Sequence, residues 1–329
     1  IRSAGTFSST GSLASGQSTQ GGNAVDEAGL ADTLAGASLV GNDIDVLGLG
    51  GTLSAVTAAG IGSDIRVDGG TGATTLGLVT AAQDINVSGG AIVSGALNGG
   101  RDITLLARTG ELTTAAVTAV RDLSLTGRLA VNANGVLSAG RDIAVSATAG
   151  RMRLSGAIAG DDLVLRATSQ IVSSGNLVSG NVTGADAAGV GDALAGATLV
   201  GGDIDAAGID FSLAAVTASG SGSDVRLDGG TGITSVLAVT AGQDITISSG
   251  SIGTGALNGG RDITLLARSG ALTSGAIGAV RDLSLTGVSV AATGLATAGR
   301  DIAVQATGGR LVLTGGANAG DDLVLRASG

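Results

Sequence analysis

Short stretches in which aliphatic and polar residues alternate recur along the whole chain, separated by corners rich in Gly and Ala. Ile103 and Leu105, for example, fall on one side of an extended chain and Thr104 on the other, which is the period-two pattern of a strand with one buried face. Residues 111–114 and 116–119 predict two further short strands before the pattern starts again. Three such strands with their corners fill about 20 residues. The chain is therefore predicted to be built from small β modules.

One signature marks the modules: an Asp, then Ile, Leu or Val, then any residue, then usually another aliphatic residue. The Asp of this signature stands at positions 43, 64, 84, 102, 122, 142, 162, 203, 224, 244, 262, 282, 301 and 322. Neighbouring positions are 18 to 21 residues apart, except that 41 residues separate Asp162 from Asp203. Because this gap is about two steps long, we interpret it as two turns, one of which lacks its Asp.

A longer duplication lies over the short period. Residues 99–108 return unchanged as residues 259–268, a displacement of 160 residues. We therefore divide the chain into two super-repeats, residues 1–164 and residues 165–329. Each super-repeat is predicted to hold one irregular segment that is either a lateral contact or an insertion tolerated at a corner. These segments are residues 17–38 and 181–198, where Leu30 and Leu34, and likewise Val190 and Leu194, have the spacing of a short helical turn or projecting loop.

A β module of this size cannot bury its own apolar edge, but copies of it stacked on one another can. The inward Ile, Leu and Val then form continuous columns. The predicted fold is all-β, a parallel β-solenoid with three strands and about 20 residues per turn. Dividing the chain length by the period predicts roughly 16 turns, or a rod of about 75–80 Å at ~4.8 Å per turn. We expect the bare ends of such a rod to be continued by further chain or to stack end to end.

Composition agrees with this fold and excludes several functions. The chain has 61 Gly and two Phe, and it has no Pro, Cys, His, Trp, Tyr or Lys. Without Cys or His it offers no disulfide, no thiolate metal site and no catalytic triad, and no apolar run is long enough for a membrane-spanning helix. A formal charge of −10, with 17 Arg dispersed among 27 acids, argues against nucleic-acid and membrane partners. We assign no catalytic, cofactor-binding or metal-binding residue, and we expect no cofactor and no enzyme activity.

The signature Asp residues are the first candidates for binding chemistry. One carboxylate per turn at a constant phase is compatible with a ladder of calcium ligands, because oxygen is the only ligand type that the chain offers. The alternative, which we favour, is that each Asp accepts hydrogen bonds from backbone N–H groups at the corner before a strand. Stacked carboxylates repel, so we expect the arginines that directly precede an Asp to pair with the Asp of a neighbouring turn. They are Arg101, Arg121, Arg141, Arg261, Arg281 and Arg300.

Two further patterns are weaker. Residues 68–72 and 228–232 both read Asp-Gly-Gly-Thr-Gly and are similar to a calcium-binding Gly–Asp repeat, but each occurs once per super-repeat. The outward Thr residues do not hold one register across the turns. We therefore expect solvated strand faces and no flat Thr array of the kind found on ice-binding solenoids.

The acid pairs Asp43/Asp45 and Asp203/Asp205 have the carboxylates of a general acid/base pair. Some β-solenoid hydrolases and lyases use clustered carboxylates on polysaccharides. Here the same pair occurs in both super-repeats, with no His, Lys or Tyr to assist it and no aromatic platform to stack a sugar. We therefore do not assign a catalytic role to these residues.

Residues 138–145 (SAGRDIAV), followed by residues 159–165 (AGDDLVL), resemble the repeat regions of filamentous-haemagglutinin-like exoproteins. Members of that family are large Gram-negative surface adhesins secreted by the two-partner route. The resemblance implies a right-handed, three-sided parallel β-helix, export as an unfolded chain, and a role as an extended fibre in adhesion or cell–cell contact.

We therefore expect the repeat region of a secreted bacterial surface fibre or filament, located outside the cell, that gives length and stiffness for adhesion, cell–cell contact or matrix assembly. Its expected partners are further copies of the same array, joined end to end or laterally, and a glycan or protein receptor on a host or cell surface. Two alternatives stay open. One is a carbohydrate-binding or carbohydrate-processing solenoid, and the other is a functional amyloid-like polymer in which turns add between molecules.

Overall fold

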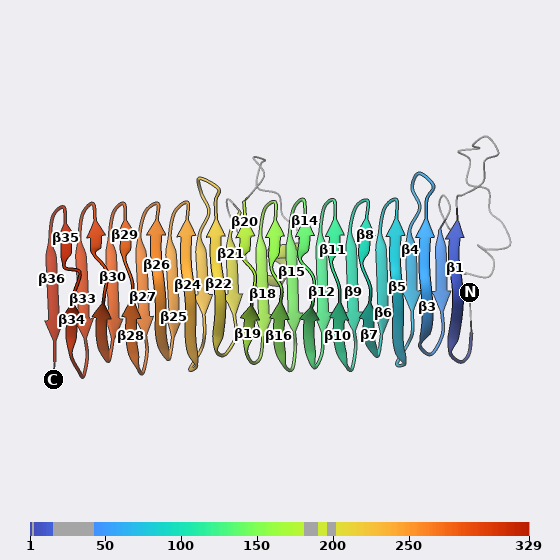
Figure 1. Cartoon of the computed structure of the whole chain (residues 1–329), viewed down its shortest axis with the longest axis horizontal. Coiled ribbons are helices and arrows are strands. Elements are labelled where there is room, and N and C mark those ends of the chain that lie inside the picture. Colours follow the sequence, from blue (N-terminus) through green and yellow to red (C-terminus); the bar gives the residue numbers. More distant parts are fainter. Residues whose placement is uncertain (2, 16–42, 181–189, 196–201, 329) are drawn as a thin grey trace. The chain divides into compact units, whose positions relative to one another are not determined.

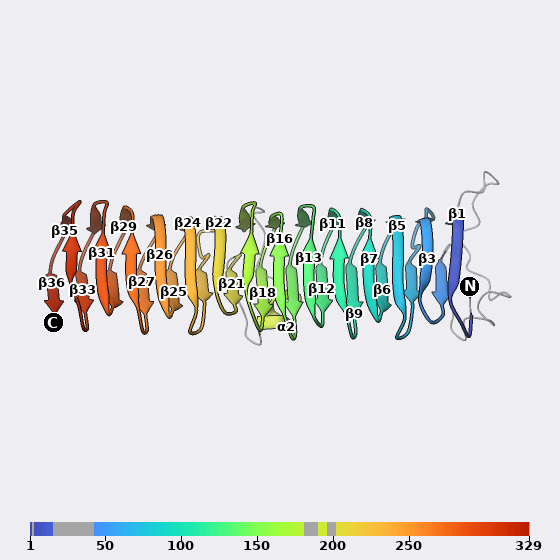
Figure 2. The same ribbon diagram turned by 60° about the horizontal axis from the view of Figure 1, so that its bottom comes forward.

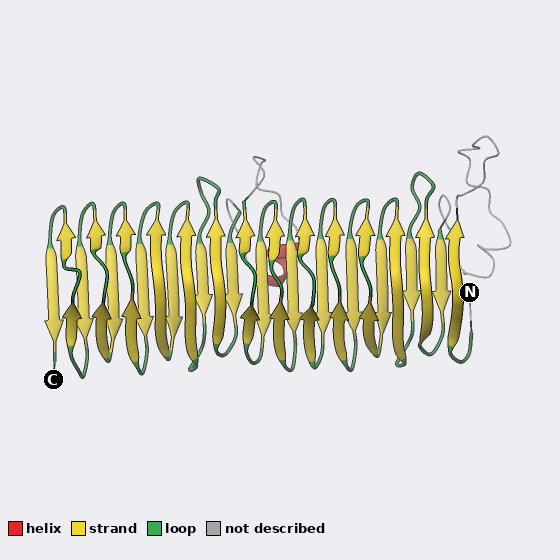
Figure 3. Cartoon of the chain, viewed as in Figure 1, coloured by secondary structure: helices red, strands yellow, loops and turns green. Residues whose placement is uncertain are grey.

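The computed structural model describes the chain except for residues 2, 16–42, 181–189, 196–201 and 329. The described residues form an all-β parallel solenoid of about 13 turns with about 20 residues per turn, and their one helix has six residues (Figure 3). The chain divides into two units, residues 1–140 with 145–150 and residues 141–144 with 151–329. The predicted fold class is confirmed. The right-handed coiling and the division into super-repeats at residue 164 stay predictions.

Each turn contributes strands to two parallel sheets. One strand per turn belongs to the first sheet, and the rest of the turn belongs to the second sheet, either as two short strands or as one long strand. Figure 1 shows these strands side by side within each unit. In the first unit the first sheet contains β2 (Ile44–Leu47), β4 (Ile65–Asp68), β6 (Ile85–Gly89), β9 (Ile103–Ala107) and β12 (Leu123–Gly127). The second sheet there contains β1 (Phe7–Ser15), β3 (Gly51–Ala58), β5 (Ala73–Ala81), β7 (Ala91–Ser94), β8 (Leu97–Gly99), β10 (Glu111–Thr114), β11 (Val117–Ala119), β13 (Ala130–Ala133) and β14 (Leu137–Ala139).

The second unit has the same arrangement, and β15 (Ile143–Ala147) contains residues of both units. Its first sheet contains β18 (Leu163–Ala167), β21 (Ile204–Ala207), β23 (Val225–Asp228), β25 (Ile245–Ser249), β27 (Ile263–Ala267), β30 (Leu283–Gly287), β33 (Ile302–Ala306) and β36 (Leu323–Ala327). Its second sheet contains β16 (Arg151–Leu154), β17 (Ala157–Ala159), β19 (Ile171–Ser173), β20 (Leu177–Ser179), β22 (Phe211–Ala218), β24 (Ile233–Ala241), β26 (Ser251–Gly259), β28 (Ala271–Ser274), β29 (Ile277–Ala279), β31 (Ser289–Ala292), β32 (Ala296–Ala298), β34 (Leu311–Leu313) and β35 (Ala317–Ala319).

The core consists of aliphatic columns that run from turn to turn. Ile103 and Leu105 of β9 align with Leu123 and Leu125 of β12, and all four side chains are fully buried. Thr104, between the first two, is exposed. The alternation of the sequence therefore predicted correctly which side chains of this strand point inward, and the stack hides apolar surface that a single turn would leave in water.

The number of turns is lower than expected from the chain length. Asp162 and Asp203 lie in adjacent turns, because β18 pairs directly with β21 and Leu163 is opposite Ile204. The step of 41 residues is therefore one turn with an insertion, and our interpretation of it as two turns was wrong. Dividing the chain length by the period counted inserted residues as if they formed turns.

This insertion lies between β20 and β21. Within it the structure describes α2 (Val190–Ala195), at the place where the spacing of Val190 and Leu194 predicted a helical turn. The helix packs against β18, as Figure 2 also shows. The corresponding prediction for residues 17–38 lies outside the described residues.

Candidate functional site

The signature Asp residues form a ladder along the corner that precedes each first-sheet strand. The backbone N–H of one Asp donates to Oδ1 of the Asp one turn earlier, with N···O distances of 2.6 Å from Asp64 to Asp43 and 2.9 Å from Asp84 to Asp64. The same bond recurs in the second unit from Asp203 onwards. The favoured interpretation of these residues is confirmed, since the carboxylates accept from backbone N–H groups at the corner.

Five of these carboxylates form an ion pair with an arginine of the following turn. Arg101 Nε donates to Asp84 Oδ1 at 2.7 Å while its Nη2 bonds Oδ2, a bidentate pair. The predicted pairing with a neighbouring turn is thereby confirmed for five arginines, which we call the arginine clamps. They are Arg101 on Asp84, Arg121 on Asp102, Arg261 on Asp244, Arg281 on Asp262 and Arg300 on Asp282.

The clamps change the acidity of the ladder. The hydrogen bond from Arg261 is the main reason that the pKa of Asp244 lies below its ordinary value, and Arg300 acts in the same way on the pKa of Asp282. Each clamped carboxylate has both oxygens bonded within the protein. Across the residues that the structure describes, no group of three or more acidic side chains is arranged to hold a metal ion.

The two Asp-Gly-Gly-Thr-Gly motifs form turns that are tied to the solenoid by an arginine. Oδ1 of Asp68 accepts from the N–H of Gly70 at 2.9 Å, and Gly70 has a φ of 56°, a conformation that favours glycine. The Nη1 group of Arg108, two turns further on, donates a hydrogen bond to Asp68 Oδ1 at 2.8 Å. This hydrogen bond is the main reason that the pKa of Asp68 is lowered. Arg268 makes the same contact with Asp228 in the second unit.

The acid pair of the second unit serves two different partners. Asp203 Oδ1 accepts from the N–H of Asp224 at 2.7 Å as part of the ladder. Asp205 Oδ2 forms an ion pair with Arg166 Nη2 at 2.6 Å. In the first unit, Asp43 occupies the same ladder position as Asp203. These contacts give the carboxylates roles in joining one turn to the next.

Outward residues of the last strand segment of each turn share one register. We call them the Thr/Asn columns. In the first unit the column is Thr57, Thr80, Asn98, Thr118 and Ser138, and in the second it is Thr217, Thr240, Asn258, Gly278, Thr297 and Asn318. The same register holds apolar residues in three other turns, Ala14, Ile158 and Val178. Thr shares this register with Asn, Ser and Gly, and Thr104 lies outward on the other sheet, so the outward Thr residues do not form one continuous Thr array.

The sequence did contain a signal for this column. Thr118 follows Asp102 by 16 residues and Asn98 follows Asp84 by 14, so counting from the preceding Asp hides the alignment. Thr118 and Asn98 both lie four residues before the next signature Asp. Counting backwards from that Asp would have aligned them.

Small or aliphatic residues stand two positions before each member of the Thr/Asn columns. Several are exposed, including Leu78 and Leu295 at 48% each. Neither row contains a charged residue, although 13% of the chain is charged. We call the two rows of each unit its uncharged face.

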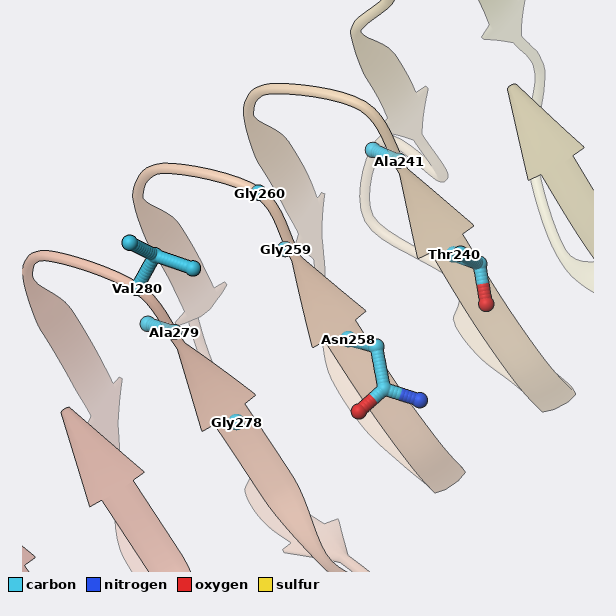
Figure 4. A pocket seen from close by; sticks show the side chains of 8 residues that line it. All are labelled: Thr240, Ala241, Asn258, Gly259, Gly260, Gly278, Ala279 and Val280. Carbon is cyan, nitrogen blue, oxygen red and sulfur yellow. The ribbon is translucent and has the colours of Figure 1, made fainter. Parts of the chain in front are cut away.

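An open hollow lies on the uncharged face of the second unit (Figure 4). Its volume is about 430 Å³. Gly278 leaves space between its outward neighbours Asn258 and Thr297 because it has no side chain, and Thr240 and Asn258 border the hollow from neighbouring strands. The lining contains neither a carboxylate nor an aromatic ring.

No family model matches the chain, and neither the curated proteins nor the solved structures include a significant match. Among the described residues, no helix is long and apolar enough to cross a membrane.

Proposed function

We propose that this chain is the repeat region of a secreted bacterial surface fibre, in which it supplies length and stiffness for adhesion, cell–cell contact or matrix assembly. The observation that carries the proposal is that one set of contacts is repeated from turn to turn within each unit. Parallel strand pairing, aliphatic columns, the Asp ladder and the arginine clamps all join a turn to its neighbour. Such an array can be lengthened by adding turns without a new kind of contact. The resemblance of residues 138–145 and 159–165 to exoprotein repeats supports the extracellular assignment.

A spacer has to grow in length when repeats are added. We would compare the maximum dimension of the chain with that of a variant that carries a second copy of residues 165–329, using small-angle X-ray scattering. That segment contains seven first-sheet strands, β21, β23, β25, β27, β30, β33 and β36. Seven turns at ~4.8 Å each predict an increase of about 34 Å. An increase in mass without this increase in length would contradict the role as a spacer.

We further propose that copies of the chain associate laterally through the uncharged face. Two chains with a formal charge of −10 each repel one another, and burying unpaired charge is costly. The uncharged face is the surface on which two copies meet without burying a charged side chain. Its exposed Leu and Thr side chains are able to pack and hydrogen-bond against the same face of a second copy.

A matched pair of variants tests the lateral contact. Thr240→Arg places a charge on the uncharged face, and Thr246→Arg places the same charge on the exposed side of the neighbouring strand β25. Both variants change the net charge equally, so a difference between them reports the position alone. We expect sedimentation velocity to show that only Thr240→Arg weakens association. Equal association of the two variants and the unmodified chain would contradict the assignment of this face.

A further inference from the structure

The Asp ladder changes character at Asp162, in the second unit. The side chain is fully buried, at 0% exposure. Its Oδ1 accepts from the N–H of Asp203 at 2.7 Å, as in the rest of the ladder. Its Oδ2 is also buried but has no hydrogen-bond partner among the residues that the structure describes. An ionised carboxylate with one oxygen in this state would be strongly destabilising, because burying an uncompensated charge is costly.

The missing partner has a cause in the sequence. A clamp on Asp162 would have to come from the residue that precedes the next signature Asp, Asp203, and that residue is Gly202. A glycine has no side chain with which to reach the carboxylate. The clamp that holds other members of the ladder is therefore missing at Asp162.

Within the described part of the chain, no positively charged group compensates for the missing clamp. On the preceding turn, Asp142 Oδ1 accepts from the N–H of Asp162 at 3.4 Å. Asp161 stands directly before Asp162, in the position that an arginine occupies in the clamped turns. On β18 the basic residue is Arg166, which is paired with Asp205 of β21.

Burial and like charges act in the same direction on this group. Burial is the main cause that raises the pKa of Asp162 to about 8, and Asp161, Asp142 and Asp203 raise it further. The N–H of Asp203 opposes the shift without cancelling it. A protonated carboxyl removes the charge and converts the acceptor-only group into one that also donates.

We propose that the boundary between β18 and β21 is a pH-sensitive joint of the solenoid, at which Asp162 packs as the neutral acid and its ionisation weakens the pairing of the two strands. The sign follows from proton binding. Between the ordinary pKa of 3.8 and the raised value near 8, the closed joint keeps a proton that the opened joint releases. The closed joint therefore becomes less stable as the pH rises through this window, and it shows no further change above it.

Native-state hydrogen exchange of the whole chain measures the opening of this joint. The informative amides are those of Asp203, bonded to the Asp162 carboxylate, and Leu163, bonded to the carbonyl of Asp203. After correction for the intrinsic exchange rate, we expect their protection to fall by up to about tenfold per pH unit between about pH 5 and pH 8. Asp162→Asn keeps the shape without the ionisation, and we expect its protection to be independent of pH in this range.

The control is Asp244→Asn, which neutralises a clamped member of the ladder and should leave the pH dependence at Asp203 and Leu163 unchanged. A pH-independent protection in the unmodified chain, or the same slope in Asp162→Asn, would overturn the proposal.

A second measurement does not depend on the stability of any variant. Labelling the Asp carboxyl carbons of the unmodified chain with carbon-13 allows their titration to be followed by NMR. We expect one resonance to titrate near pH 8, well above the usual range of Asp, about 3.5 ± 1.2. Titration of every Asp resonance below about pH 5 would contradict the neutral state of Asp162.

Discussion

The most decisive perturbation of the core is a pair of identical substitutions at neighbouring residues of β27. Leu265 is fully buried, and it aligns with Ile247 in the turn before and Leu285 in the turn after. Leu266, the next residue, is 38% exposed. Leu265→Ala leaves a cavity in the aliphatic column, and the cost of such a change is about 2–5 kcal/mol. We expect the upper half of this range, because backbone hydrogen bonds to the turns on both sides fix the spacing of the turns, so the cavity cannot collapse.

Leu266→Ala is the matched control and should cost less than about 1 kcal/mol, as substitutions of exposed side chains usually do. The chain has no Trp or Tyr, so unfolding by urea would be followed by far-ultraviolet circular dichroism. Peptide-resolved hydrogen exchange would locate the defect within the turns that contact β27. Leu105→Ala and Leu106→Ala repeat the comparison in the first unit, with exposures of 0% and 37%. Equal costs for the buried and exposed leucines would refute the assignment of inward and outward positions.

Three further predictions concern the contacts between turns. Arg101→Gln should destabilise the first unit by less than about 1 kcal/mol, because the clamp is partly exposed and solvent screens it. Arg66→Gln, at an exposed position of β4 in the same unit, should have no effect, and a salt titration to about 1 M should abolish the difference between the two variants. Gly77→Ala should destabilise the first unit strongly, because the added Cβ would collide with the carbonyl oxygen of Ser54. The control is Gly253→Ala, whose Cβ would make only ordinary contacts, and thermal unfolding would compare the two variants. Acid should destabilise the ladder, because clamped carboxylates have a lowered pKa in the folded chain. Their contribution to stability is present above the unfolded pKa of about 4 and is lost as the pH falls below it. Urea titrations at several pH values would detect this loss as a falling midpoint of unfolding.

Much of this fold follows from patterns that act within one turn. The alternation around Thr104 places its neighbours inward without knowledge of any other turn. The constant phase of the Asp residues predicted that they lie at one corner, and the Arg that precedes many of them predicted the clamps.

Features that depend on which turns meet were harder to predict. The gap between Asp162 and Asp203 has the length of two turns, but the extra residues form an insertion within one turn. The period alone therefore predicted a turn that does not exist. The missing clamp on Asp162 depends on this adjacency, since the direct contact of these two turns places Gly202 at the position of a clamp. The Thr/Asn columns were missed because corners differ in length and shift Thr and Asn relative to the preceding Asp.

Electron cryo-microscopy of the protein purified without denaturant would show directly whether the chain is a parallel β-solenoid. We expect density in which the turns of each unit are stacked about 4.8 Å apart, with the signature Asp side chains in line along one corner. A compact globule of packed helices, or strands that pair within a turn instead of between turns, would contradict the solenoid and the spacer function that rests on it.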